Sequence, residues 1–266
     1  MTRLTSYEGL TALVTGASSG IGRLLALRMA AAGARIALVA RRERELEELA
    51  EEIRAGGGEA VPLVCDVADR QQVLETAEKA AKALGRIDVL VNNAGFGHHR
   101  PFLDWDVEDM ERVMQVNFLG SLYFTKALLP AMVERGRGWL LFIASAAGRI
   151  APADETIYAA SKHAMVGLAG SLSLEVEKAG VHVLTVCPGA IRTPFFDAEA
   201  LARLPAVARR QMAEPEDLVE AIIGALARGK RELTFPRWIV SGYVAQALAP
   251  SFFRRQLKKH TVIDDE

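Results

Sequence analysis

The sequence holds few cysteines and no excess charge of either sign, and each scarcity excludes a class of protein. Cys65 and Cys187 are the only cysteines among 266 residues, and each lies within an apolar run. Such residues are typical of small buried hydrophobic side chains, so we predict neither a disulfide framework nor a cysteine metal site. The formal net charge is −1, which gives no electrostatic footprint for nucleic acid, and no nucleic-acid-binding motif is present.

Metal-ligand spacing and targeting signals are missing as well. The N-terminal segment MTRLTSYEGLTALV lacks a charged start, a long apolar run and a small-residue cleavage site, so we expect a soluble cytoplasmic protein in a reducing compartment. No linker, repeat or low-complexity tract interrupts the chain, and we expect one domain over 1–266. The histidines show no ligand spacing, and we predict ordinary surface or packing roles and no metal site for His98, His99, His163, His182 and His260.

Apolar runs alternate with segments of helical periodicity along most of the chain. Buried strands are predicted over 11–15, 34–41, 60–67, 87–95, 139–148, 181–189 and 232–236. Helices are predicted over 20–33, 43–57, 73–85, 106–134, 156–180 and 216–226. Short connections between alternating strands and helices predict parallel βαβ units, and continuous apolar strands are typical of a sheet covered on both faces. The predicted fold class is α/β, a Rossmann-like doubly wound parallel β-sheet flanked by helices on both faces.

The stretch TGASSGIG, from Thr15 to Gly22, lies between the first strand and the first helix. Its glycines are spaced more widely than in the common G-x-G-x-x-G fingerprint. They permit a tight turn that brings backbone N–H groups and the positive helix end toward a pyrophosphate. The alternative is a plain turn that starts a helix. The predicted cofactor contacts here are Gly16, Ser18, Ser19, Gly20, Ile21 and Gly22.

The end of the second strand indicates which dinucleotide the site prefers. A free ribose 2′-hydroxyl favours Asp or Glu there, whereas this chain has Arg41 and Arg42. Two guanidiniums suit a 2′-phosphate, so we predict NADP(H) over NAD(H), with Arg41 the stronger candidate because it directly follows the strand. The alternative is a solvated helix start in which both arginines pair with Glu43 or Glu45.

The next two strand ends also carry residues that suit a cofactor. Asp66 and Val67 are placed to meet an adenine ring, although Asp66 suits a helix N-cap equally well. The third predicted contact group follows the fourth strand, where small residues permit close approach of the backbone to a ribose: Asn93, Ala94 and Gly95.

The candidate catalytic residues centre on Tyr158 and Lys162, which lie four residues apart in a predicted helix and therefore on one face. A lysine cation beside a phenol lowers the pKa of the phenol, as general acid–base catalysis requires. Ser145, at the end of the fifth strand, can donate a hydrogen bond to a substrate oxygen, and Asn117 is a polar residue in an apolar helix. For the Tyr-x-x-x-Lys spacing alone, an unremarkable surface pair is the alternative.

In order from Thr15 to about Thr193, these motifs resemble the short-chain dehydrogenase/reductase family, including its wider glycine spacing and the NNAG motif at 92–95. The resemblance implies a catalytic tetrad of Asn117, Ser145, Tyr158 and Lys162. Tyr158 would exchange the substrate proton, Ser145 would hold the substrate oxygen, Lys162 would bind the nicotinamide ribose and lower the pKa of Tyr158, and Asn117 would hold a water. It also implies homodimers or homotetramers built through the helices carrying Asn117 and Tyr158. Contacts to the nicotinamide amide are implied for Pro188, Gly189, Ile191 and Thr193.

The substrate pocket is expected from three regions, 96–105, 149–156 and the segment after Thr193. The third region, near 190–214, is predicted to be a mobile lid over a pocket for a medium-sized apolar or lipid-like carbonyl or alcohol compound. Its apolar residues could equally pack on the core. They are Phe195, Phe196, Leu201, Leu204 and Met212. A polar mouth is suggested by His98, His99 and Arg100.

A C-terminal extension near 237–260 is apolar and aromatic first, then basic. It is too short and too interrupted, by Arg237 and Pro250, to span a membrane. Two alternatives stay open. The extension packs against the body or a second subunit, or it rests on an anionic membrane surface with Arg254, Arg255, Lys258 and Lys259 at the headgroups.

The sequence therefore predicts an NADP(H)-dependent oxidoreductase that transfers a hydride between the nicotinamide and a small-molecule carbonyl or alcohol. Two alternatives are an NAD-dependent alcohol dehydrogenase working oxidatively and a nucleotide-binding regulatory protein without chemistry. The presence of all four tetrad residues argues against the second of these.

Overall fold

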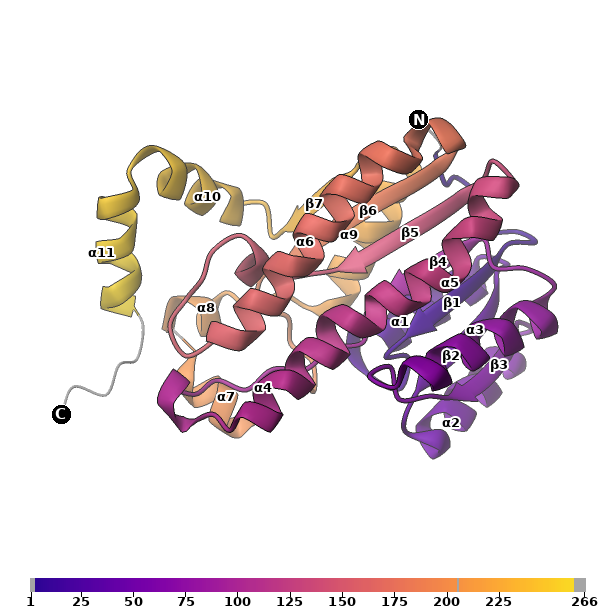
Figure 1. Ribbon diagram of the computed structural model, residues 1–266, viewed down its shortest axis with the longest axis horizontal. Helices are drawn as coiled ribbons and strands as arrows, with labels where there is room; N and C mark the ends of the chain where they lie inside the picture. The colour runs from indigo at the N-terminus through magenta and orange to yellow at the C-terminus, as the bar shows by residue number, and fades with distance from the viewer. Residues whose placement is uncertain (1–2, 205, 261–266) are drawn as a thin grey trace.

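A computed structural model describes residues 3–204 and 206–260, and its centre is a seven-stranded sheet with the order β3-β2-β1-β4-β5-β6-β7 (Figure 1). All neighbouring strands pair in parallel. The strands are β1 (Thr11–Thr15), β2 (Arg35–Ala40), β3 (Glu59–Val64), β4 (Val89–Asn92), β5 (Gly138–Ile143), β6 (Val181–Pro188) and β7 (Glu232–Phe235). The predicted doubly wound α/β fold is confirmed.

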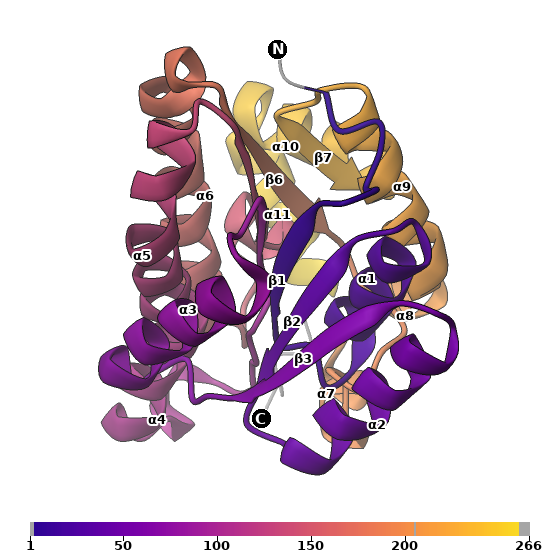
Figure 2. The same cartoon turned by 90° about the vertical axis from the view of Figure 1, so that its right-hand side faces the viewer.

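Helices cover both faces of the sheet (Figure 2). One face carries α1 (Gly20–Ala31), α2 (Glu43–Ala55) and α9 (Pro215–Ala227), and the other carries α3 (Arg70–Leu84), α5 (Gly120–Glu134) and α6 (Thr156–Val176). The remaining helices are α4 (Val107–Met114), α7 (Ala198–Arg203), α8 (Ala206–Arg210), α10 (Ile239–Leu248) and α11 (Pro250–His260).

Each face of the sheet has its own hydrophobic core, because side chains alternate along a strand. In β1, Val14 packs with Leu25 and Met29 of α1, whereas its neighbour Leu13 packs with Phe124 of α5 on the opposite side. The two free cysteines are buried, as predicted.

The crevice of the sheet lies beside β1, where the chain leaves β3 and returns on the other side as β4. Such a reversal of strand order is where ligands of doubly wound sheets bind, outside the carboxyl ends of the strands. The side chain of Thr15 shapes this edge. Its hydroxyl accepts hydrogen bonds from the amides of Asn93 and Ala94, each at 3.0 Å, and donates to the carbonyl of Val91 at 3.1 Å.

Three predicted strands end at least three residues earlier in the structure than the apolar runs indicate. β4 ends at Asn92 because Thr15 takes the next two amides, and β3 ends at Val64 rather than at residue 67. β5 ends at Ile143, and a 3₁₀ turn, η3 (Ala146–Gly148), replaces the end of the predicted strand over 139–148. Ser145 caps this turn by accepting a hydrogen bond from the amide of Ala147 at 3.1 Å.

The predicted helix over 106–134 is continuous but not uniform. Between α4 and α5 it passes through a π-helical turn, η2 (Gln115–Leu119), which contains the buried Asn117. The stretch Val107–Glu134 is long and apolar enough to cross a membrane, but α5 packs on the core through Phe124 and Leu128. We interpret it as a core helix.

The C-terminal extension forms a helical arm, which we define as residues 237–260 and which contains α10 and α11. The arm follows the predicted last strand, β7, and lies beside the body of the molecule at the end where the lid segment and the N-terminus of α6 are found (Figure 1).

Candidate active site

A cavity of about 820 Å³ lies at the carboxyl ends of the strands. It extends from Arg41 and Asp66, at the ends of β2 and β3, past Ser145 and Tyr158 to the arm, where Phe253 lines it. All four predicted catalytic residues lie in or against this cavity, although they are separated by up to 45 residues in the chain.

The glycine-rich turn is held in a conformation that side chains would disrupt. Gly16 and Gly20 have φ angles of +66° and +56°, which favour glycine. A Cβ atom on Gly16 would lie 2.8 Å from Nδ2 of Asn93, and one on Gly22 would lie 2.5 Å from the carbonyl oxygen of Gly16. The turn therefore packs tightly against the end of β4, and Gly22 serves this packing in addition to any role with a ligand.

The arginine that engages the turn is Arg42. Its guanidinium donates to the Ser18 hydroxyl at 2.8 Å from Nη2 and to the Ser19 hydroxyl at 2.8 Å. Its Nε lies 3.8 Å from Glu45, so the predicted alternative of an ion pair within the helix also holds in part. Arg41 is exposed and lines the cavity. The expectation that Arg41 is the better placed of the two is not supported, because only Arg42 is fixed by hydrogen bonds to the turn.

Asp66 is fixed from two sides at the end of β3. Nη2 of Arg112 lies 2.5 Å from Oδ2 of Asp66, and the amide of Ala68 donates to Oδ1 at 3.0 Å. Partial burial raises the pKa of Asp66, but these hydrogen bonds and the charges of Arg112 and Arg41 outweigh it and lower the pKa below its usual value. The N-cap alternative is wrong, because Asp69 caps α3 through the amides of Gln71 and Gln72.

Asn93 connects the glycine turn to the end of β4. Its side-chain amide donates to the carbonyl of Thr15 at 2.9 Å, and its backbone amide donates to the Thr15 hydroxyl at 3.0 Å. With Ala94 and Gly95 it lines the cavity as predicted, and Val67 lines it beside Asp66.

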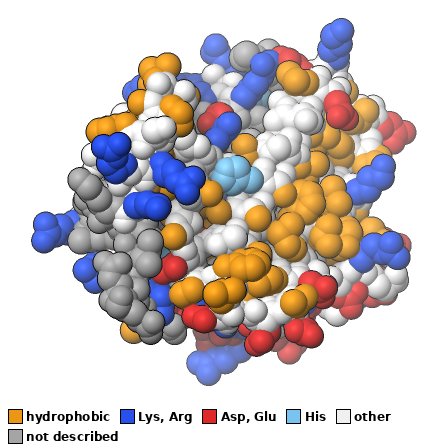
Figure 3. Space-filling model, turned by 60° about the vertical axis from the view of Figure 1, so that its left-hand side comes forward, with side chains coloured by type: hydrophobic (Ala, Val, Ile, Leu, Met, Phe, Trp, Pro, Cys, Tyr) orange, Lys and Arg blue, Asp and Glu red, His pale blue; other side chains and the backbone are white. Residues whose placement is uncertain are grey.

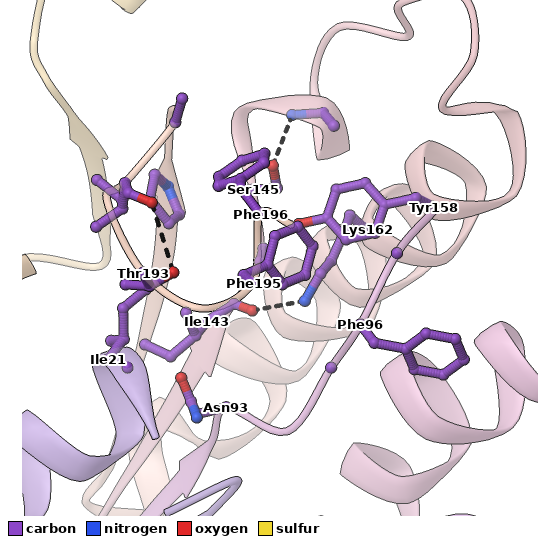
Figure 4. Close-up of a pocket in the computed structure, with 18 of the residues that line it drawn as sticks. Ile21, Asn93, Phe96, Ile143, Ser145, Tyr158, Lys162, Thr193, Phe195 and Phe196 are labelled. Carbon is purple, nitrogen blue, oxygen red and sulfur yellow. Dashed lines mark hydrogen bonds between the residues drawn. The ribbon is translucent and has the colours of Figure 1, made fainter. Parts of the chain in front are cut away.

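Tyr158 lies at the centre of the cavity with Ser145 and Lys162 (Figure 4). Burial raises the pKa of Tyr158 far above its usual value, the hydrogen bond with the Ser145 hydroxyl lowers it, and the charge of Glu155 raises it further. The expectation that Lys162 lowers this pKa is therefore not met by the protein groups alone. The phenol is held in its protonated form at neutral pH.

Lys162 is buried and has one hydrogen-bond acceptor, the carbonyl oxygen of Ile143, at 2.9 Å (Figure 4). The β4–β5 pairing ends at Phe142, whereas Ile143 still pairs with Val186 of β6, so this carbonyl belongs to the last residue of β5. Burial lowers the pKa of Lys162 to about 8. Nζ lies 5.7 Å from the ring centroid of Tyr158, which places the ammonium close enough to act on the phenol and on a ligand beside it.

Asn117 is held by the loop that follows β4. Its Oδ1 accepts from the amide of Phe96 at 3.0 Å, and its Nδ2 donates to the carbonyl of Phe96 at 2.9 Å and to the Ser161 hydroxyl at 3.0 Å. A Cβ atom on Gly95 would lie 3.2 Å from Oδ1 of Asn117 and 3.4 Å from Nζ of Lys162. Asn117 thus positions this loop beside Lys162, and the water expected at Asn117 stays a prediction.

The segment after β6 covers the site with aromatic rings. Phe195 packs on Tyr158 with centroids 5.6 Å apart, and Phe196 packs on His99 at 5.7 Å (Figure 4). Leu204 also lines the cavity, whereas Leu201 and Met212 do not. At the turn, Thr193 lies against Gly20, on which a Cβ atom would be 3.3 Å from Cβ of Thr193. Pro188, Gly189 and Ile191 line the cavity as predicted.

The predicted polar mouth is only partly present. His98 and His99 line the cavity, whereas Arg100 stacks on Trp105 at 4.2 Å and pairs with Asp109. Nε2 of His99 lies 3.2 Å from Oε1 of Glu155 at the start of α6, and its buried Nδ1 has no hydrogen-bond partner.

Two contributions to the site were missed from the sequence. Gly97 lies against the catalytic candidate Tyr158, because a Cβ atom there would be 2.8 Å from Cδ2 of the ring. The arm forms a wall of the cavity through Trp238, Ile239, Gly242 and Phe253. The Gly97 signal is visible only as one more glycine after NNAG, and the arm carries no local motif.

The residues present fit a dinucleotide. The glycine turn leaves room for a close approach, the side chains at the β2 end are basic, and the buried Lys162 lines the middle of the same cavity. Among the described residues no group of three His, Cys, Asp or Glu side chains could hold a metal ion.

The model of the short chain dehydrogenase family matches residues 10–203 of this chain. The chain belongs to the short-chain dehydrogenase/reductase family. It is 41% identical over 196 residues to the oxidoreductase UcpA of Salmonella typhimurium, and the aligned residues make up 73% of each chain. This family member is therefore an oxidoreductase of CH–OH or C=O groups that binds a nicotinamide dinucleotide.

Solved structures of the family include complexes with either cofactor. A short chain dehydrogenase/reductase from Burkholderia phymatum in complex with NAD is 26% identical, with a TM-score of 0.84, and 92% of this chain and 95% of that one are covered. An actinorhodin polyketide ketoreductase with NADPH is 30% identical, with a TM-score of 0.77, and the match covers 87% and 97%.

Proposed function

We propose that this short-chain dehydrogenase/reductase is an NADP(H)-dependent reductase of medium-sized apolar or lipid-like carbonyl compounds. The observation that carries the proposal is one continuous cavity. It has arginines at its dinucleotide end, the Ser145–Tyr158–Lys162 cluster in its middle and apolar side chains at its far end.

The preference for NADP(H) is supported by the end of β2. Arg42 is held at the glycine turn by Ser18 and Ser19, Arg41 stands next to it, and no carboxylate follows the strand directly. A fixed guanidinium is suited to a ribose 2′-phosphate, whereas the ribose hydroxyl of NAD favours a carboxylate at this place.

In the reductive direction Tyr158 is the proton donor, and its phenol carries a proton at neutral pH as an ordinary tyrosine does. When bound, the nicotinamide supplies the hydride for the substrate carbon. The buried phenol, kept neutral by its raised pKa, gives its proton to the substrate oxygen, which the Ser145 hydroxyl holds by a hydrogen bond. The products are an alcohol and a phenolate, and the phenolate recovers its proton before the next turnover.

Lys162 lies with its Nζ 5.7 Å from the ring centroid of Tyr158 and lines the same cavity. With a pKa of about 8, it is mostly an ammonium at neutral pH, and its position in the crevice suits it to bind ribose hydroxyls as well. Asn117 acts through the loop at Phe96, which it holds by two hydrogen bonds beside Gly95 and Lys162.

The proposed substrate class is supported by the lining beyond Tyr158. Phe195, Phe196, Ile150 and Phe253 are apolar, whereas the polar groups there are few and include His99 and Glu155. One similar structure is that of a polyketide ketoreductase, an enzyme named for the reduction of a ketone. Homo-oligomer formation and a cytoplasmic location stay predictions.

The cofactor proposal is tested by titrating the protein with NADPH and NADH while following fluorescence and thermal stability. We expect NADPH to bind at least about tenfold more tightly, the effect of one charge-assisted contact. Arg42→Asp should remove the preference. The matched control is Arg44→Asp, an exposed arginine of the same region that pairs with Glu48 and does not line the cavity. Equal or tighter NADH binding would sink the proposal in favour of the NAD-dependent alcohol dehydrogenase.

The chemistry is tested with Tyr158→Phe, which keeps the ring packing on Phe195 and removes the proton donor. Turnover of carbonyl substrates should fall by at least about a hundredfold while NADPH affinity is kept. A regulatory protein without chemistry would show no turnover in the wild type and no difference in the variant.

A further inference from the structure

The arm has two unlike faces. On its inner face, a Cβ atom on Gly242 would lie 3.4 Å from Cδ1 of Ile150, and Nε2 of Gln246 donates to the carbonyl of Arg149 at 3.4 Å. Ile239 and Phe253 point the same way and line the cavity. This face is accounted for by contact with the body and with the substrate end of the cavity.

The outer face carries an apolar stripe that nothing in the described chain covers. We define the stripe as Val240, Val244 and Leu248, which recur at intervals of four residues along α10, together with Phe252 of α11, which follows the break in the helix at Ala249. They are 43% to 80% exposed. Residues four apart lie on one side of a helix, so the three aliphatic members form a continuous exposed row over the whole length of α10.

The charged residues of the arm itself are all basic, and three acidic residues, Asp264, Asp265 and Glu266, follow it in the sequence. Residues 237–260 contain five Lys or Arg and no Asp or Glu, in a chain whose net charge is −1. Arg254, Arg255 and Lys258 are exposed on α11, and the side chain of Lys259 lies outside the described ones. Figure 3, turned so that this end of the molecule comes forward, shows hydrophobic side chains gathered in patches with both basic and acidic side chains beside them.

We propose that the arm docks on a membrane surface that carries anionic lipid, with the stripe at the boundary of the acyl chains and the α11 cations at the lipid phosphates. An exposed apolar row beside cations is the pattern of helices that lie in the interface. α10 is 10 residues long and Pro250 follows it, which is too short for a span. A second copy seated on the arm would bring its own cationic α11 to the same place.

The location of the arm connects this docking to the active site. Gly242 and Phe253 belong to the arm and line the cavity, so a docked arm brings the substrate end of the cavity to the lipid surface. This link between docking and the active site rests on the proposed function, because the substrates proposed there are apolar carbonyl compounds that dissolve in lipid. The docking itself needs only the stripe and the cations.

Docking is tested by sedimenting the full-length protein with vesicles of phosphatidylcholine alone or with 30 mol% phosphatidylglycerol, a fraction of about one lipid in three chosen to give a strong surface charge. We expect the protein to pellet only with the anionic vesicles and to be released by about 0.5 M salt, which screens surface charges. Pelleting that is equal on both vesicles, or absent from both, contradicts the proposal.

Matched variants separate the stripe and the cations from the rest of the surface. Leu248→Glu with Phe252→Glu, and separately Arg254→Glu with Arg255→Glu, should each lower binding at least about tenfold, since one basic residue near the surface is worth about fivefold. Leu74→Glu, and separately Lys79→Glu with Lys82→Glu, alter exposed residues of α3 and should leave binding unchanged. Equal losses in the controls would overturn the assignment to the arm.

Two further readouts keep docking apart from catalysis and assembly. NADPH-dependent reduction of a water-soluble ketone in vesicle-free buffer should be the same in the wild type and the stripe variant. The failure of that reaction in both proteins counts against the proposed function and leaves the docking result intact. If sedimentation equilibrium shows that the stripe variant breaks a wild-type oligomer, a second copy covers the stripe and docking on lipid is wrong.

Discussion

Lys162 is a buried cation with a single protein acceptor, and its position has a cost in stability. Burial lowers its pKa from 10.5 to about 8, so the folded protein releases this proton more easily than the unfolded chain. The unfolded chain therefore binds more protons between about pH 8 and 10.5, and folding becomes more favourable as the pH rises through that window.

The direction of this pH dependence of stability can be measured by urea unfolding of the wild type and of Lys162→Met at pH 7 and pH 10. From pH 7 to 10 the wild type should gain stability relative to the variant, by up to about 3 kcal/mol for a shift of this size. Other groups titrate equally in both proteins and cancel in the difference. A wild type that loses stability relative to the variant would contradict burial as the cause.

The hydroxyl of Thr15 makes three hydrogen bonds at the edge of the sheet. It donates to the carbonyl of Val91 and accepts from the amides of Asn93 and Ala94. Thr15→Val keeps the shape and leaves those groups without their partner, which should lower the free energy of unfolding by about 2–4 kcal/mol and weaken NADPH binding. Thr15→Ser keeps the hydroxyl and should recover most of both. Chemical denaturation and cofactor titration of the two variants check this.

For single residues, the sequence predicts the contacts between side chains that lie close together along the chain. Tyr158 and Lys162 are one helical turn apart, so their common face follows from the chain itself. The partners of Thr15, the carbonyl that receives Lys162 and the contact of Gly97 with Tyr158 depend on strand ends meeting in space. No pattern along the chain records these contacts.

The segment between β6 and α9 is the least regular element around the site. Its helices α7 and α8 have six and five residues, too few to be stable alone, so their order depends on contacts such as those of Phe195 with Tyr158 and of Phe196 with His99. The sequence predicted a lid here without its helices, because runs this short have no measurable period.

Removing one of these rings should loosen the lid segment without unfolding the sheet. We expect Phe196→Ala to speed tryptic cleavage after Arg203, Arg209 or Arg210 severalfold, since proteolysis follows local opening. NADPH with substrate should restore protection. Leu174→Ala, on the far surface of α6, serves as the control, and equal cleavage rates for the two variants would refute the dependence on the aromatic contacts.

The strands predicted from the sequence are longer at their carboxyl ends than the strands of the structure. The apolar runs over 87–95 and 139–148 continue past Asn92 and Ile143, where ladder pairing stops and the cavity lining begins. Small apolar residues such as Ala94 and Ala146 suit both a buried strand and a ligand-lined turn. Hydropathy alone therefore cannot separate them.

Over the whole molecule, the arm contacts the body through Ile239, which packs against Gly189, and through its contacts at Ile150 and Arg149. A chain that ends at Ser241 should fold and bind NADPH as tightly as the full chain, because the hydrogen bonds of Arg42 with the glycine turn and of Lys162 with Ile143 involve no residue of the arm. It should show a severalfold higher KM for apolar ketones, since Gly242 and Phe253 are lost from the cavity wall. Cofactor titration and steady-state kinetics on the same preparation check both, and a loss of NADPH affinity would show that the arm supports the body.

The different burial of the three tryptophans gives the molecule a built-in optical probe. Trp139 and Trp105 are 1% and 6% exposed, whereas Trp238 is 51% exposed at the base of the arm. A soluble quencher such as iodide should therefore reach the emission of Trp238 and spare the other two. Because Trp238 also lines the cavity, its emission wavelength and its quenching should change when a ligand binds at the substrate end or when the arm is covered, without any added label.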